Sequence, residues 1–214
     1  MHDAVSSWPW SLAVSLAGGP AGWAAGRLAA AYAPEPNSRF AGAMIVATMA
    51  AFGWAGAVVP AGGVLALSLI LAWVLVTLAA IDLISLRLPD VLTLPLIAAG
   101  LAASAVLPGA PIIDHLIGSA AGYGVFAALA LAWRRWRRKE GIGLGDAKLL
   151  AAAGAWLGWR SLPSVVVMAC AIAFVWVGML AVRRGGKALH APVAFGAPLC
   201  VGTWIVWLHG PLSF

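Results

Sequence analysis

The stretch "GGVLALSLILAWVLVTLAAIDLISL", residues 62–86, decides the fold class. Its first charged residue is Asp82, and a helix that crosses the hydrocarbon core of a bilayer needs about 20 apolar residues. Across the chain 63% of the residues are hydrophobic and 9% are charged, whereas about a quarter of the residues of a soluble domain are charged. The sequence therefore predicts an all-α protein that crosses a membrane several times.

Proline, glycine and charged residues divide the chain into about eight expected spans. These are residues 9–32, 40–59, 62–84, 91–109, 112–133, 145–160, 162–182 and 192–209. The sixth and eighth are short, so we expect them to tilt little or to thin the membrane locally. We expect residues 1–61 to form a two-helix segment and residues 62–214 to form a six-helix core.

The basic residues predict the orientation of the spans. When "RRWRRK" (134–139) is placed in the cytoplasm and the spans alternate, only Arg160 of the 13 lysines and arginines falls outside. This distribution follows the positive-inside rule and predicts that both termini lie outside. It also accounts for the net charge of +6, so we expect no nucleic-acid partner. The N-terminus has no basic n-region, so we expect the first span to be retained.

Most of the acidic residues have plain structural interpretations. Asp90 follows Pro89 and precedes an apolar run, which predicts the N-cap of the fourth helix. Asp114 stands at the start of the fifth span, where a cap or an interfacial position is favoured over chemistry.

Asp82 differs because it has apolar neighbours on both sides. An ionised carboxylate within a membrane costs at least about 2.5 kcal/mol unless it is paired, hydrated or protonated, so its default interpretation is functional. The alternative is that the third helix ends early and Asp82 lies among the lipid headgroups.

Asp146 follows the glycine-rich stretch "GIGLG", residues 141–145. A helix start favours a carboxylate through the helix dipole, so a capping role would explain Asp146 if it stood alone. However, the third span is expected to end at the cytoplasmic face near Asp82, and the sixth to begin there at Asp146. Both acids are therefore predicted at the same depth.

Two carboxylates close together in a cleft of low dielectric cannot easily both ionise, so the pair holds one proton between them. One acid can then take a proton from water while the other hydrogen-bonds the scissile carbonyl, which is aspartic peptidase chemistry. Gly143 and Gly145 leave the backbone bare beside Asp146, so an extended substrate can approach closely.

Other polar residues give weaker signals. Lys148 is two positions past Asp146 on the expected helix, so we expect it to reach toward the membrane interface instead of pairing with Asp146. The four histidines are scattered, and Cys170 and Cys200 match no zinc or redox spacing, so no metal site is expected.

Three segments together resemble a known family: "IDLISLRLPDVLTLPL" (81–96), "KEGIGLGDAKLL" (139–150) and "APVAFGAPL" (191–199). They are similar to the type IV prepilin peptidases, membrane aspartic peptidases with a G-x-G-D motif. The resemblance implies that Asp82 and Asp146 are the catalytic pair, on the cytoplasmic side.

The resemblance covers residues 66–209 and assigns further positions. Gly143 and Gly145 match the motif glycines, and Pro192 and Gly196 match the family's late proline–glycine segment. Asp90 and Lys148 are expected to support the site. Many two-domain members carry a second acid two positions after the first catalytic one, where this chain has Ile84.

The resemblance also implies a function. Such an enzyme removes the basic leader from type IV prepilins or type II secretion pseudopilins at the bacterial inner membrane, without a cofactor. Larger members carry a cytoplasmic insertion with zinc-binding cysteines, linked to N-methylation of the new N-terminus. Here only "APEPNSR" (33–39) joins the first two spans, so methyltransferase activity is not expected.

Three alternatives stay open at this point. A presenilin-like protease would cut other membrane helices, although those relatives place a tyrosine where this chain has Ile81. A proton-coupled transporter would use Asp82 and Asp146 as a relay. A structural assembly factor would need neither acid. The lipid bilayer is an expected partner in every case, and the sequence does not define the oligomeric state.

Overall fold

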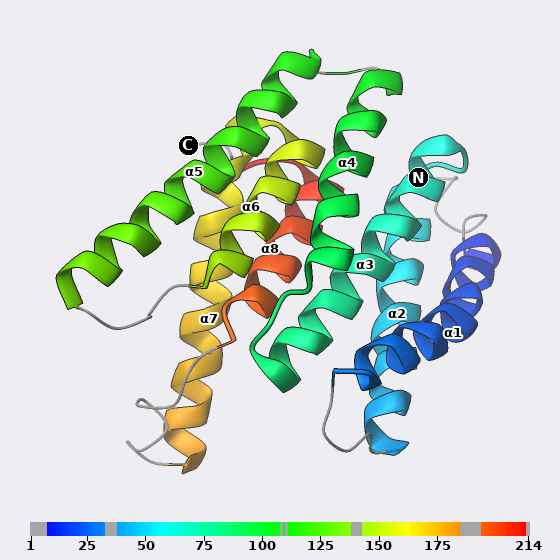
Figure 1. Cartoon of the computed structure of the whole chain (residues 1–214). Helices are drawn as coiled ribbons and strands as arrows, with labels where there is room; N and C mark the ends of the chain where they lie inside the picture. The colour runs from blue at the N-terminus through cyan, green and yellow to red at the C-terminus, as the bar shows by residue number, and fades with distance from the viewer. Residues whose placement is uncertain are drawn as a thin grey trace. The chain divides into compact units, whose positions relative to one another are not determined.

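A computed structural model describes residues 8–32, 38–107, 109, 111–137, 143–184 and 194–212 (Figure 1). These residues form eight α-helices and one 3-10 turn, and no strand occurs among them. The α-helices are α1 (Trp8–Ala30), α2 (Ser38–Val58), α3 (Gly63–Ser85), α4 (Asp90–Val106), α5 (Ile112–Arg137), α6 (Leu144–Leu157), α7 (Leu162–Arg184) and α8 (Gly196–His209). The all-α prediction is confirmed.

The helix lengths fall into two groups. Four stretches are long and apolar enough to cross a bilayer: Arg39–Val58, Gly63–Ser85, Ile112–Ala132 and Trp159–Arg183. The chain is therefore a multi-pass membrane protein. By contrast, α4 has 17 residues, and α6 and α8 have 14 each. A helix of 14 residues is about 21 Å long, which is shorter than the hydrocarbon core of about 30 Å.

The chain divides into two compact units, Met1–Ser85 and Leu86–Phe214. By packing, α3 belongs with α1 and α2, so the structural division falls at the end of α3. The sequence motifs predict a different division, between residues 61 and 62, which assigns α3 to the six-helix core. Which helices form the active site stays a prediction.

In the first unit, α1 and α2 run antiparallel, and glycine lets their backbones meet. A Cβ atom on Gly18 would lie 2.7 Å from the Cα of Met49, so any side chain there would push the helices apart. The indole of Trp73 on α3 donates a hydrogen bond of 2.9 Å to the carbonyl of Ala21 on α1. Close backbone approach and hydrogen bonds of this kind hold helices together in lipid.

In the second unit, α6 lies at the centre of the packing, and its residues 149–156 are all buried. α5 packs antiparallel on it, with Gly118 against Gly154 and Gly122 against the carbonyl of Leu150. α4 runs parallel to α6 on another side, where the indole of Trp156 donates a 2.9 Å hydrogen bond to the carbonyl of Leu96.

α8 and α7 complete the second unit. The rings of Trp156 on α6 and Trp207 on α8 meet edge to face, with centroids 5.4 Å apart. α7 packs antiparallel to α8, where Gly202 lies against the carbonyl of Val165. Consequently α4, α6 and α8 run in one direction and α5 and α7 in the other, which is the alternation that consecutive membrane spans require.

The contact between Gly118 and Gly154 leads to a stability prediction. In Gly118→Ala the new Cβ would lie 2.6 Å from the carbonyl oxygen of Gly154, which is backbone and cannot rotate away. We expect this variant to lose about 1–3 kcal/mol of stability, the usual cost of overpacking. Its unfolding temperature in detergent should fall.

Gly124→Ala is the matched control, because it lies on the same helix and a Cβ there would meet nothing within 4 Å. Removing this helical glycine should raise stability slightly, by about 0.5 kcal/mol or more. Equal unfolding temperatures for the two variants would show that α5 and α6 do not rely on this contact.

Candidate active site

Asp82 lies in the last turn of α3, in the first unit. It is 5% exposed, and its neighbours on the same helix, Leu78 and Ile81, are fully buried. α3 continues to Ser85, whose hydroxyl donates a 2.8 Å hydrogen bond to the carbonyl of Ile81. The helix therefore does not end before Asp82, and the carboxylate is a buried acid near a helix end.

The chain leaves α3 through a short link, residues 86–89. Leu86 has φ +54°, in the left-handed region, where a residue with a side chain costs about 1–2 kcal/mol. Pro89 then takes an extended conformation and is the N-cap of α4. This strained residue ends one helix and lets the next begin four residues later.

Asp146 lies in the first turn of α6, in the second unit, and is partly buried. Gly143 is the N-cap, in an extended conformation, and its carbonyl accepts a 3.2 Å hydrogen bond from the Asp146 amide. At a helix N-terminus the unpaired amides and the helix dipole stabilise a carboxylate. The predicted start of this helix at the glycine-rich stretch is confirmed within one residue.

The two motif glycines have different surroundings. A Cβ on Gly143 would meet its nearest atoms, the Gly145 nitrogen and an Asp146 carboxylate oxygen, only at 3.9 and 4.0 Å, so this backbone is accessible. A Cβ on Gly145 would lie 3.0 Å from the Cβ of Leu88, in the link before α4. Gly145 thus permits close packing of the link, while Gly143 has the open backbone that a substrate strand needs.

Asp90 and Lys148 form an ion pair that the sequence did not predict. Lys148 Nζ on α6 lies 2.5 Å from Asp90 Oδ1 on α4, and the side chains are 26% and 56% exposed. The prediction that Asp90 caps α4 was wrong: Pro89 occupies the N-cap, and no side chain caps the helix. Lys148 turns toward α4 because α4 and α6 run parallel and begin at the same level.

The late segment brings the start of α8 into contact with α5 through one pair of aromatic rings. Gly196 is the first residue of α8 and is buried, whereas Pro192 lies outside the described residues. The ring of Phe195, the N-cap, stacks on Phe126 of α5 with centroids 6.2 Å apart. Sequence analysis missed this ring pair, because Phe126 lies in an apolar run with no pattern that marks one face.

The starts of α6 and α8 lie at one level within the second unit. Gly118 of α5 faces Gly154 of α6, and Gly122 faces Leu150. Because the two helices are antiparallel, Phe126, four residues further along α5, lies level with Asp146, four residues before Leu150 on α6. α5 continues from Phe126 to Arg137, 11 residues or about 16 Å along its axis. α7 likewise runs on past the start of α8, and both free ends are visible in Figure 1.

The far end of the second unit holds a separate polar group. The indole of Trp159 donates a 3.2 Å hydrogen bond to Asp114 Oδ1, and His115 Nδ1 lies 3.0 Å from the carbonyl of Ala155. Asp114 therefore links the start of α5 to the turn after α6, and its capping or interfacial role stays a prediction.

Neither Cys170 nor Cys200 is in a disulfide. In the part of the chain that the structure describes, no three His, Cys, Asp or Glu side chains group closely enough to hold a metal ion.

Comparison with known proteins gives a consistent result. A sequence model of the Type IV leader peptidase family matches residues 69–178, which include Asp82, Gly143, Gly145 and Asp146. The chain is 38% identical over 189 residues to "Prepilin leader peptidase/N-methyltransferase" of Aeromonas hydrophila, covering 88% of this chain and 64% of the relative.

Two further relatives differ in length. A protein of the same name from Aeromonas salmonicida (strain A449) is 42% identical over 152 residues, which cover 71% of this chain and 51% of the relative. "Leader peptidase HopD" of Escherichia coli is 42% identical over 121 residues, covering 56% of this chain and 77% of the relative. The chain thus spans about half to two thirds of the length of the two longer relatives. No solved structure matches it.

The Asp90–Lys148 pair generates the next prediction. Both side chains are partly exposed, so we expect a coupling of about 0.2–1 kcal/mol in a double-mutant cycle of Asp90→Ala and Lys148→Met, followed by thermal unfolding in detergent. Asp90→Asn retains an oxygen acceptor and should be nearly silent. Strictly additive effects of the two substitutions would show that the pair does not join α4 to α6.

Proposed function

The chain belongs to the type IV leader peptidase family, and we propose that it is a membrane aspartic endopeptidase that removes the basic leader from type IV prepilins or type II secretion pseudopilins. The observation that carries the proposal is the family match over residues 69–178, which contain a buried aspartate and the G-x-G-D sequence. The names of the relatives agree with this activity.

In the proposed mechanism Asp82 and Asp146 share one proton. The ionised acid takes a proton from a water molecule, whose oxygen attacks the scissile carbonyl carbon. The protonated acid hydrogen-bonds the carbonyl oxygen and stabilises the charge that develops there. The tetrahedral intermediate then collapses, the C–N bond breaks, and the amine of the mature protein leaves with a proton from the pair.

Chain connectivity supports one membrane face for the two acids. The link 86–89 joins the end of α3 to the start of α4, and the Asp90–Lys148 pair joins the start of α4 to the first turns of α6. The positive-inside rule favours the cytoplasmic face, because α5 and α7 end in arginine-rich sequence on the same side as the start of α6. We therefore propose an active site that faces the cytoplasm of the bacterial inner membrane.

The substrate reaches the site by its backbone in this proposal. Gly143 is exposed and a Cβ there would make no close contact, so an extended segment of substrate can lie against it. The dipole of α6 polarises the same region and suits a developing negative charge. Gly145 keeps α6 close to the link at Leu88.

The two acids generate the central prediction. Asp82→Asn and Asp146→Asn should each reduce cleavage of a prepilin substrate by about 100-fold or more, because neither amide can exchange the shared proton. Purified enzyme in detergent and a gel shift of the substrate provide the measurement. The unfolding temperature should stay near that of the unaltered protein.

Asp114→Asn is the matched control, because it makes the same substitution in the first turn of another helix, α5. Asp114 lies beside Trp159, at the end of the second unit opposite to Asp146. The Asp114→Asn variant should cleave at the unaltered rate. Robust cleavage by either Asp82→Asn or Asp146→Asn would remove that residue from the catalytic pair. If the unaltered protein does not cleave prepilin but transports protons across the membrane, the proton-coupled transporter function is favoured instead.

Methylation gives a separate prediction. The segment between α1 and α2 contains no cysteine, whereas the larger family members carry their cysteine-bearing insertion there. We propose that α1 and α2 support the peptidase units without forming a second active site. Mature pilin made with this protein as its only processing enzyme should keep a free N-terminal amine, and mass spectrometry of that N-terminus is the measurement. A mass increase of one methyl group would contradict the proposal.

A further inference from the structure

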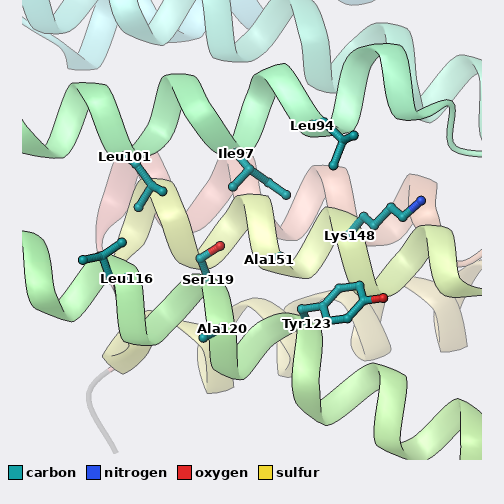
Figure 2. Close-up of a pocket in the computed structure, with 9 residues that line it drawn as sticks. All are labelled: Leu94, Ile97, Leu101, Leu116, Ser119, Ala120, Tyr123, Lys148 and Ala151. Atoms are coloured by element: carbon teal, nitrogen blue, oxygen red, sulfur yellow. The ribbon is translucent and has the colours of Figure 1, made fainter.

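A pocket of about 470 Å³ lies within the second unit, where α4 and α5 both pack on α6 (Figure 2). Leu94, Ile97 and Leu101 on α4 form one wall, at spacings that place them on a single helix face. The small residues Ser119 and Ala120 of α5 leave room on the opposite side. None of the pocket residues belongs to the proposed catalytic pair.

The pocket is elongated along the helices. Leu94 and Leu101 are seven positions apart, and so are Leu116 and Tyr123, so the pocket is about 10 Å long. A flexible hydrocarbon chain fits these dimensions.

The two ends of the pocket differ in polarity. Figure 2 shows Lys148 and Tyr123 at one end and Leu101 and Leu116 at the other. The ammonium and the phenol offer hydrogen bonds at the first end, and the second end offers only hydrocarbon. This arrangement matches an amphiphile with one polar head and one tail along the pocket.

The charges at the polar end favour a particular headgroup. Lys148 carries a positive charge there, and Asp90, which does not line the pocket, lies 2.5 Å from the Lys148 ammonium and adds a negative charge beside this end. An anionic headgroup would be attracted by one residue and repelled by the other, whereas a headgroup with both charges can satisfy both. A primary ammonium also donates hydrogen bonds to a carboxylate, which a quaternary ammonium cannot do.

We propose that this pocket binds a zwitterionic phospholipid with a primary amine in its headgroup, such as phosphatidylethanolamine. One acyl chain lies along the pocket, the phosphate contacts Lys148 and Tyr123, and the ammonium contacts Asp90. Lipid tails are as apolar as leucine, so the tail alone gives no preference for the pocket over the bilayer. The headgroup contacts therefore decide which lipid is bound, and the proposal does not depend on peptidase activity.

The first experiment measures which lipid stays with the protein. Full-length protein is reconstituted in bilayers of equal parts phosphatidylethanolamine, phosphatidylcholine and phosphatidylglycerol, extracted in mild detergent and examined by native mass spectrometry. We expect retained phosphatidylethanolamine, enriched about threefold over the others, since partly exposed ion pairs contribute little. Enrichment of phosphatidylglycerol or phosphatidylcholine would overturn the headgroup assignment.

Variants locate the lipid. Ala120→Leu fills the pocket from α5 and should abolish retention, and Leu94→Phe from α4 should do the same if Ala120→Leu fails to fold. Ala128→Leu is the matched control, because Ala128 is exposed on the same helix outside the pocket, and it should retain the lipid. Unchanged retention by folded Ala120→Leu or Leu94→Phe would place the lipid elsewhere.

A headgroup variant tests the charge assignment. Asp90→Asn should still retain phospholipid, but without the threefold preference for the primary amine. An unchanged preference would contradict the role of Asp90.

Photocrosslinking identifies the occupant directly. A photoreactive residue at position 120 should crosslink to phospholipid in bilayers. A crosslink to added prepilin, or to a second copy of the chain, in place of lipid would assign the pocket to a protein helix and overturn the proposal.

Discussion

The backbone contact between Gly118 of α5 and Gly154 of α6 fixes the position of α6, and α4 and α8 also pack on α6. Hydrophobic burial gives little drive for association in a bilayer, so helices must gain contact by approaching closely. Two glycines that face each other allow this approach. Because α6 has its start fixed in this way, Asp146 has a defined depth relative to α4, α5 and α8.

Polar contacts fix the position of α4 along α6. Lys148 binds Asp90 at the start of the parallel pair α4 and α6, and Trp156 binds the carbonyl of Leu96 further along. Two such contacts at different heights prevent α4 from sliding along α6. Asp90 therefore fixes the position of α4 along α6.

The sequence predicted the helices well, because hydropathy and the breaks at Pro and Gly are local properties. It also predicted the start of α6, since "GIGLG" cannot continue a helix well. It could not predict that Lys148 meets Asp90, because the two residues are 58 positions apart and their contact depends on how α4 packs. Gly118 was missed for the same reason: its importance comes from Gly154 on another helix. The packing of α3 with α1 and α2 likewise depends on the bond from Trp73 to Ala21, which no local pattern marks.

The difference in helix length has a consequence for where the mismatch with the membrane is met. α6 and α8 are about 21 Å long, while α5 and α7 reach about 39 and 35 Å, so a bilayer of uniform thickness cannot match both pairs. Because α6 and α8 are largely buried and the spans of α5 and α7 are mostly exposed, lipid contacts mainly the long helices. The short helices are thus surrounded by protein, and the mismatch between helix lengths is met inside the second unit.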